Sequence, residues 1–184
     1  MLLGDVGALE ATVRSAATGD HAAFADLVAE HHASMARVAF VICGEAEPTL
    51  DAVQSAWTIA WRRIGSLRDP TQVRPWLVAI AANEARQIMR RRRRERVVDI
   101  SELVAGIEGG YPVASSDVVD LERALRGLKA EDRSLLAIRY AAGLDSSEIA
   151  RQLGMSASGV RSRLARLLDR LREDLALEPE TDHE

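Results

Sequence analysis

Five consecutive arginines at residues 90–94 are the densest run of charge in the chain. They close a stretch with helical periodicity that opens with Arg74 and Trp76 and carries Asn83 midway. A second basic helix is predicted near the C-terminus, after the turn residue Gly154. Guanidinium groups bind phosphate oxygens, while Asn and Trp side chains can bond to bases and stack on them. The chemistry that these residues suggest is therefore nucleic-acid binding.

The distribution of charge supports this interpretation, although the formal net charge of the whole chain is −4. Residues 62–96 hold 11 Arg and 3 acidic residues, a net charge of +8. The flanking segments are acidic: residues 1–61 carry −6, residues 97–160 carry −4 and residues 161–184 carry −2. A focused basic patch attracts phosphate even on an acidic protein.

The stretch with the arginine run has a predicted binding face of its own. A flat aromatic ring beside an amide is suited to holding an unstacked base of single-stranded DNA, and the arginines would follow the backbone. The alternative is a solvated, charged helix face. The candidate DNA-binding residues of this helix are Arg74, Trp76, Asn83, Arg86 and Arg90.

Residues 146–161 fit a helix-turn-helix. Ala150 is small enough for two helices to cross closely, and Gly154 can take the positive φ of the turn. Four apolar residues would hold the second helix on the first: Ile149, Leu153, Val160 and Leu164. The alternative is a helical hairpin whose arginines are only solvated. With the apolar face buried, polar residues remain to reach a major groove and its phosphates: Ser158, Arg161, Ser162, Arg163 and Arg166.

Helical periodicity runs through most of the chain, and no segment alternates for long enough to predict a strand. We expect an all-α protein of two small helical domains, residues 1–96 and 117–177. A Gly-containing linker at 97–116, with a short helix near 101–107, would join them, and an acidic tail would follow at 178–184. The expected helices cover residues 20–42, 48–65, 72 through the arginine run, 117–128, 131–142, 146–153 and 156–175.

Several classes of function are excluded by what the sequence lacks. The single Cys43 rules out an internal disulfide and a cysteine-rich zinc site, and it fits a reducing cytoplasm. His21, His31 and His32 have no companion ligands, so no metal site is expected. The sequence shows no membrane-spanning run, signal peptide, phosphate loop or nucleophile elbow. We therefore expect a cytoplasmic protein that is not an enzyme, with no cofactor and no small-molecule substrate.

In this order, the motifs resemble the extracytoplasmic-function (ECF) group of bacterial RNA polymerase sigma factors. The first block is similar to domain two of that family and the second to domain four, which includes Arg133 and Tyr140 before the helix-turn-helix. Each motif alone is loose, whereas both in this order and separation are specific. The blocks are residues 19–24, 51–54 and 76–83 for domain two and residues 121–175 for domain four.

The resemblance implies roles for particular residues. Asp51, Val53 and Gln54 would bind the clamp helices in the largest subunit of the RNA polymerase core. Residues 66–74 and Asn83 would capture a base of the melted minus-ten element. The helix carrying Ser158, Arg161, Arg163 and Arg166 would read the minus-thirty-five element of promoter DNA. Family membership also implies an anti-sigma factor as a partner.

Two other functions remain open from the sequence. A free-standing helix-turn-helix regulator would bind a palindromic operator unaided, as a dimer. A sigma-like adaptor would bind protein partners without reading DNA.

Overall fold

The computed structural model describes residues 3–98 and 116–176, with side chains described for 7–94 and 120–175. All regular elements within these ranges are helical, which confirms the predicted all-α fold. None of the helices there is long and apolar enough to cross a membrane. The helix expected near 101–107 and the acidic tail lie outside the described residues. The elements are α1 (Leu3–Ala17), α2 (His21–Cys43), α3 (Ala46–Arg63), η1 (Ile64–Ser66), η2 (Pro70–Gln72), α4 (Val73–Val98), α5 (Ser116–Gly127), α6 (Ala130–Leu136), the π-helical turn η3 (Ala137–Ala141), α7 (Ser146–Leu153) and α8 (Ala157–Ala176).

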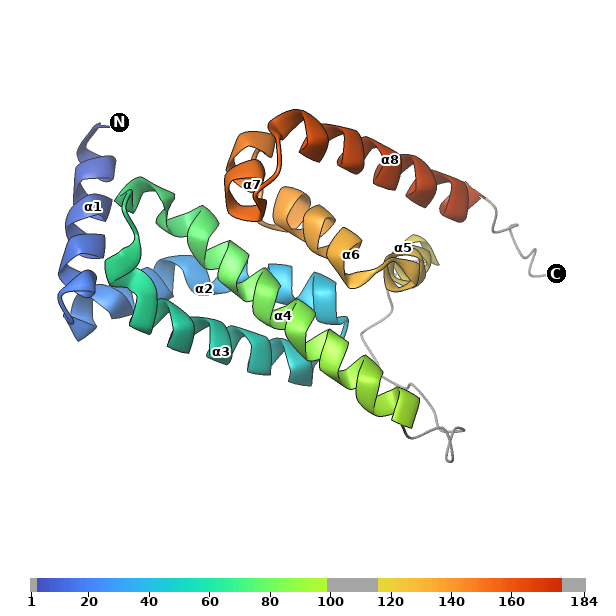
Figure 1. The fold of residues 1–184 in the computed structure, drawn as a ribbon, viewed down its shortest axis with the longest axis horizontal. Helices are drawn as coiled ribbons and strands as arrows, with labels where there is room; N and C mark the ends of the chain where they lie inside the picture. The colour runs from blue at the N-terminus through green and yellow to red at the C-terminus, as the bar shows by residue number, and fades with distance from the viewer. Residues whose placement is uncertain (1–2, 99–115, 177–184) are drawn as a thin grey trace.

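The N-terminal unit is a bundle in which α4 lies across α2 and α3 (Figure 1). Helix α2 begins where the sequence predicts, because the carboxylate of Asp20 accepts the N–H groups of Ala22 and Ala23 at 2.9 and 3.2 Å. It ends at Gly44, whose φ of 74° places it in the left-handed region. Local capping residues therefore fix both ends of this helix.

Helix α1 is not among the helices expected from the sequence. It packs against α2 and buries Val13 and Ala16, each 2 % exposed. The core of the N-terminal unit therefore includes this helix in addition to the three that the sequence predicts for residues 20–94.

The buried face of α4 also differs from the stripe that helical periodicity predicts, which is Val73, Trp76, Leu77, Ile80 and Ile88. Trp76, Ile80 and Ile88 are only half-buried. Small side chains instead let α2 and α3 approach α4 closely, because alanine adds little bulk between packed helices. The fully buried positions of α4 include Val73, Leu77, Val78, Ala81, Ala82 and Ala85.

The C-terminal unit contains the predicted helix-turn-helix. Asp145 begins α7 with a capping box, in which its carboxylate accepts the Glu148 N–H and the Glu148 carboxylate accepts the Asp145 N–H. Gly154 makes the turn at φ 64°. Ser156 then accepts the Gly159 N–H at 3.0 Å, which caps α8. The predicted crossing is confirmed, since Ile149 and Val160 are fully buried in it.

The two units pack directly against each other. Helix α6 and the π-helical turn lie on α2, and α6 and α7 also contact α4. One continuous apolar cluster joins Val38 and Ile42 of α2 with Leu135 and Ile138 of the C-terminal unit. The sequence gives no indication of this contact.

The turn glycine provides a test of the helix-turn-helix geometry. We expect Gly154→Ala to destabilise the chain by about 1–2 kcal/mol, because a Cβ is unfavourable at positive φ even though open space surrounds it. Gly127→Ala is the matched control, since Gly127 also has open space around its Cβ but is helical. Urea unfolding of both variants makes the comparison, and equal losses of stability would contradict this account of the turn.

Candidate nucleic-acid interface

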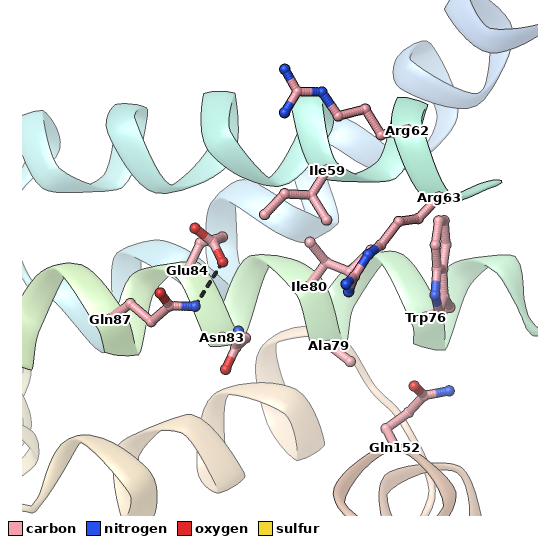
Figure 2. A pocket seen from close by; sticks show the side chains of 10 residues that line it. All are labelled: Ile59, Arg62, Arg63, Trp76, Ala79, Ile80, Asn83, Glu84, Gln87 and Gln152. Atoms are coloured by element: carbon pink, nitrogen blue, oxygen red, sulfur yellow. Dashed lines mark hydrogen bonds between the residues drawn. The ribbon is translucent and has the colours of Figure 1, made fainter. Parts of the chain in front are cut away.

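An open cavity of about 620 Å³ lies beside α4 and brings together two of the predicted base-binding residues. Figure 2 shows Trp76 and Asn83 on the same helix, with residues of α3 on one side and Gln152 of α7 on the other. Trp76 is half-buried and Asn83 is exposed, so both reach this cavity. The lining residues are Ile59, Arg62, Arg63, Trp76, Ala79, Ile80, Asn83, Glu84, Gln87 and Gln152.

Arg86 orients the amide of Asn83. Its Nη2 donates to Asn83 Oδ1 at 3.3 Å, which occupies the carbonyl oxygen and leaves the amide N–H₂ for a base edge. Burial lowers the pKa of Arg86, and the neighbouring Arg90 lowers it further. Arg86 was predicted to contact DNA directly. In the structure Arg86 is half-buried and bonded to Asn83, and its own contact with DNA stays a prediction.

Arg62 and Arg63 are cavity residues that the sequence analysis did not select. Both are exposed, and Figure 2 shows them at the end of α3, where the Arg63 side chain extends toward α4 and the Arg62 side chain points away from it. Guanidinium groups placed here could neutralise the phosphates on either side of a bound base. The sequence does contain a feature that could have indicated them, because two adjacent arginines end a predicted helix immediately before a loop.

Two predicted DNA-binding arginines of α4 instead contact the C-terminal unit. The Nη2 of Arg74 donates to the carbonyl of Ala142, just beyond the π-helical turn. Arg90 Nε lies 3.6 Å from Glu131 Oε1 of α6. In this arrangement both side chains have partners in the C-terminal unit, and their contact with DNA stays a prediction.

Most of the α8 residues that were predicted to read DNA are exposed to solvent. Ser158, Arg161, Ser162 and Arg166 are all exposed. Arg163 is the exception: its Nε and Nη2 donate to Asp132 Oδ1 at 3.1 and 2.7 Å, and the side chain is half-buried. In this structure Arg163 ties α8 to α6, and its contact with DNA stays a prediction.

The helix predicted to contact polymerase presents two of its three candidate residues. Asp51 and Gln54 are exposed, and both line a groove of about 430 Å³ between α3 and α4. Val53 is only 4 % exposed and belongs to the core, so its predicted contact role is wrong. Leu50 is 68 % exposed beside Asp51, an apolar side chain that the sequence analysis did not assign to this surface.

Comparisons with known proteins agree with the division of the chain into two helical units. Residues 18–95 match the family model "Sigma-70 region 2", and residues 119–171 match "Sigma-70, region 4". The ECF RNA polymerase sigma factor SigM of Mycobacterium tuberculosis is 32 % identical over 158 residues, which cover 83 % of this chain and 77 % of SigM. The chain is a member of the ECF sigma factors.

Solved structures and a further relative extend the comparison. CnrH, solved with the cytosolic domain of CnrY, aligns with a TM-score of 0.71 at 24 % identity, over 92 % of this chain and 98 % of CnrH. RpoE from Bartonella quintana, solved with the anti-sigma factor NepR, gives a TM-score of 0.69 at 24 % identity, over 85 % and 98 % of the two chains. This sigma factor spans 42 % of the probable RNA polymerase sigma factor RfaY of Xanthomonas campestris pv. campestris, with 29 % identity over 87 % of its own length. The two structures support the fold.

The neighbouring arginines of α8 provide a second prediction. We expect Arg163→Ala to destabilise this sigma factor by about 1 kcal/mol, because it leaves the largely buried carboxylate of Asp132 without its cation. Arg161→Ala should leave stability unchanged, since Arg161 is exposed. Thermal unfolding of both variants gives the comparison, and a larger loss in Arg161→Ala would contradict it.

Proposed function

We propose that this sigma factor binds the RNA polymerase core in the cytoplasm and directs it to promoters, with no catalytic step of its own. The observation that carries the proposal is the cavity holding Trp76 and Asn83, combined with a separate recognition helix. The N-terminal domain, residues 1–96, would capture single-stranded DNA. The C-terminal domain, residues 117–177, would read duplex DNA.

Strand capture follows from the chemistry of the cavity. The ring of Trp76 offers a stacking surface, the Asn83 amide offers two donors to a base edge, and Arg62 and Arg63 offer cations for phosphates. Stacking on the Trp76 ring requires an unstacked base, which a closed duplex does not present. This cavity therefore fits the melted minus-ten element better than duplex DNA.

Duplex reading is assigned to the exposed face of α8. Ser158 and Arg161 lie near the start of the helix, the part that contacts base edges in helix-turn-helix proteins. Ser162 and Arg166 lie on later turns and would bind phosphates. The partner of this face is the minus-thirty-five element.

The two domains must separate to act on one promoter. The two elements are about 25 base pairs apart, and at about 3.4 Å per pair that distance is on the order of 85 Å. In the packed arrangement, Gln152 of the helix-turn-helix lies at the strand-capture cavity itself. We therefore infer that the packed arrangement is a resting form and that Arg74 and Arg90 become available to DNA when it opens.

The polymerase contact is assigned to the exposed face of α3. Asp51 and Gln54 offer a carboxylate and an amide, and Leu50 adds an exposed apolar group beside them. A partly apolar patch with polar neighbours is typical of protein interfaces. The proposed partner is the clamp-helix region of the largest polymerase subunit.

An anti-sigma factor is the proposed inhibitory partner, because RpoE was solved with the anti-sigma factor NepR. A wholly apolar hollow of about 290 Å³ lies between α2 and the C-terminal domain. Exposed Leu121 and Tyr140 stand at this hollow, which suits the apolar face of a partner helix.

Run-off transcription with purified core polymerase tests the proposal. We expect promoter-specific initiation only when core and this sigma factor are combined, and weak duplex binding by the sigma factor alone. Tight binding to a palindromic operator without core would favour a free-standing regulator. Core binding without any promoter selection would favour an adaptor.

Charge reversal on α3 tests the polymerase contact. We expect Asp51→Arg to weaken binding to core by about tenfold while the helical content and unfolding midpoint stay unchanged, since Asp51 is exposed. Asp26→Arg makes the same charge change at an exposed position of α2 and should bind core normally. Affinity measurements with labelled sigma factor give both values, and equal affinities would move the contact away from α3.

Replacement of the base-binding amide tests strand capture. We expect Asn83→Ala to slow promoter opening and to relax selection at one base of the minus-ten element, because a lost base-edge hydrogen bond costs about 1–3 kcal/mol. Binding to the minus-thirty-five element should be unaffected. Opening rates on a set of minus-ten variants make the measurement, and a uniform loss on all of them would indicate a structural role for Asn83.

A further inference from the structure

A cationic cleft of about 350 Å³ lies between the C-terminal half of α4 and the start of α6. Both domains line it, so the complete cleft exists only while they are packed together. Six of its lining side chains are cationic and two are carboxylates. The lining residues are Glu45, Met89, Arg90, Arg92, Arg93, Arg126, Leu128, Lys129, Ala130, Glu131 and Arg133.

The two carboxylates of the cleft are already paired. Glu131 lies 3.6 Å from Arg90, and Glu45 lies 3.0 Å from Arg92. Arg126 has its own partner on α5, Glu122, at 2.6 Å.

The other three cations of the cleft have no carboxylate partner within the described part of the chain. Among the described residues, no carboxylate lies within ion-pairing distance of Arg93, Lys129 or Arg133. Positive charge from both domains therefore meets here in excess of the two carboxylates that line the cleft.

Arg133 shows most clearly that an acceptor is missing. Its side chain lines the cleft, yet the residue is only 8 % exposed, and its buried Nε–H has no hydrogen-bond partner. Burial lowers the pKa of Arg133, and the neighbouring Arg126 lowers it further. A buried guanidinium donor without an acceptor is unfavourable, and an anion in the cleft would satisfy it.

We propose that this interdomain cleft binds a short polyphosphate, whose phosphate groups bridge Arg93 of α4 and Lys129 and Arg133 at the start of the C-terminal domain's α6. Guanidinium and ammonium groups are the usual phosphate ligands in proteins. Linked phosphates can contact cations on both walls at the same time, which favours a polyphosphate over a single small anion in a cleft of about 350 Å³. Inorganic polyphosphates and nucleoside triphosphates share this chemistry.

Binding at this position would favour the packed form. A ligand that contacts both domains binds the packed arrangement more tightly than the separated one, and by linkage it stabilises packing. Only the effect on transcription rests on the proposed function. The binding itself requires neither polymerase nor promoter.

Titration calorimetry of the full chain with sodium tripolyphosphate tests the cleft. We expect tighter binding than for sulfate at matched ionic strength. Lys129→Met should raise the Kd about tenfold, because one charge-assisted contact is lost from an exposed residue. Arg172→Met, an exposed arginine of α8, should leave the Kd unchanged. Arg133→Met should weaken binding at least as much as Lys129→Met.

A substitution far from the cleft tests whether binding requires the packed domains or only the basic residues of α4. Arg37 Nε donates to the carbonyl of Ala141 at 3.4 Å, at the far end of the segment that begins with α6. That end is about 12 Å from Arg133, the last cleft residue of α6, at 1.5 Å per helical residue, and this is beyond the screening length of about 8 Å at physiological salt. We expect Arg37→Glu to weaken tripolyphosphate binding about fivefold by loosening the domain contact. Arg14→Glu, an exposed arginine of α1, is the matched control.

ATP in place of tripolyphosphate distinguishes the two sources of the ligand. Tighter binding of ATP would indicate a nucleotide, and equal binding would indicate the phosphate chain alone.

The proposal is overturned if tripolyphosphate binds no better than sulfate, if Lys129→Met binds normally, or if Arg37→Glu matches Arg14→Glu. Wild-type run-off transcription is measured in parallel, so a failure of the cleft is distinct from a failure of the proposed function.

Discussion

The apolar contact of α6 and the π-helical turn with α2 and α4 determines how every surface of this sigma factor is presented. Val38 and Ile42 of one domain and Leu135 and Ile138 of the other belong to a single buried cluster. Apolar burial is the main favourable term in such packing. This contact sets the position of the helix-turn-helix relative to α4 and forms the cationic cleft.

Polar contacts at the edges of this cluster give it a defined orientation. Arg37 and Arg74 donate to the carbonyls of Ala141 and Ala142, where a helical segment ends and its carbonyls lack internal partners. At the other end, Arg133 is buried without an acceptor for its Nε–H. The carbonyl groups at the Ala141–Ala142 end of the segment therefore have hydrogen-bond partners, whereas the Nε–H of Arg133 at the other end has none. That asymmetry is consistent with an interface that can open.

Features set by neighbours in the sequence were predictable, because caps and turns depend on a few adjacent residues. Asp20 begins α2 and Gly154 makes the turn of the helix-turn-helix as expected. Helix α1 was missed because Gly4 and Gly7 weaken its helical signal and its buried stripe is short.

Features set by distant partners were not predictable. Val53 was assigned to a protein contact, but the packing of α3 buries it. Arg163 has the spacing of a DNA-reading residue, yet Asp132 lies 31 positions earlier in the chain and binds it. A single sequence indicates that an arginine occupies a helix face but not which acceptor comes to lie opposite.

The position of Cys43 gives this sigma factor a built-in chemical reporter of its domain arrangement. Cys43 is 3 % exposed in the cluster that both domains form, and burial raises the pKa of its thiol to about 11. Alkylating reagents attack the thiolate, so the packed form resists them at neutral pH. Separation of the domains would return the thiol toward its ordinary acidity and admit the reagent. Because the chain has one cysteine, the rate of its modification measures opening without an added label.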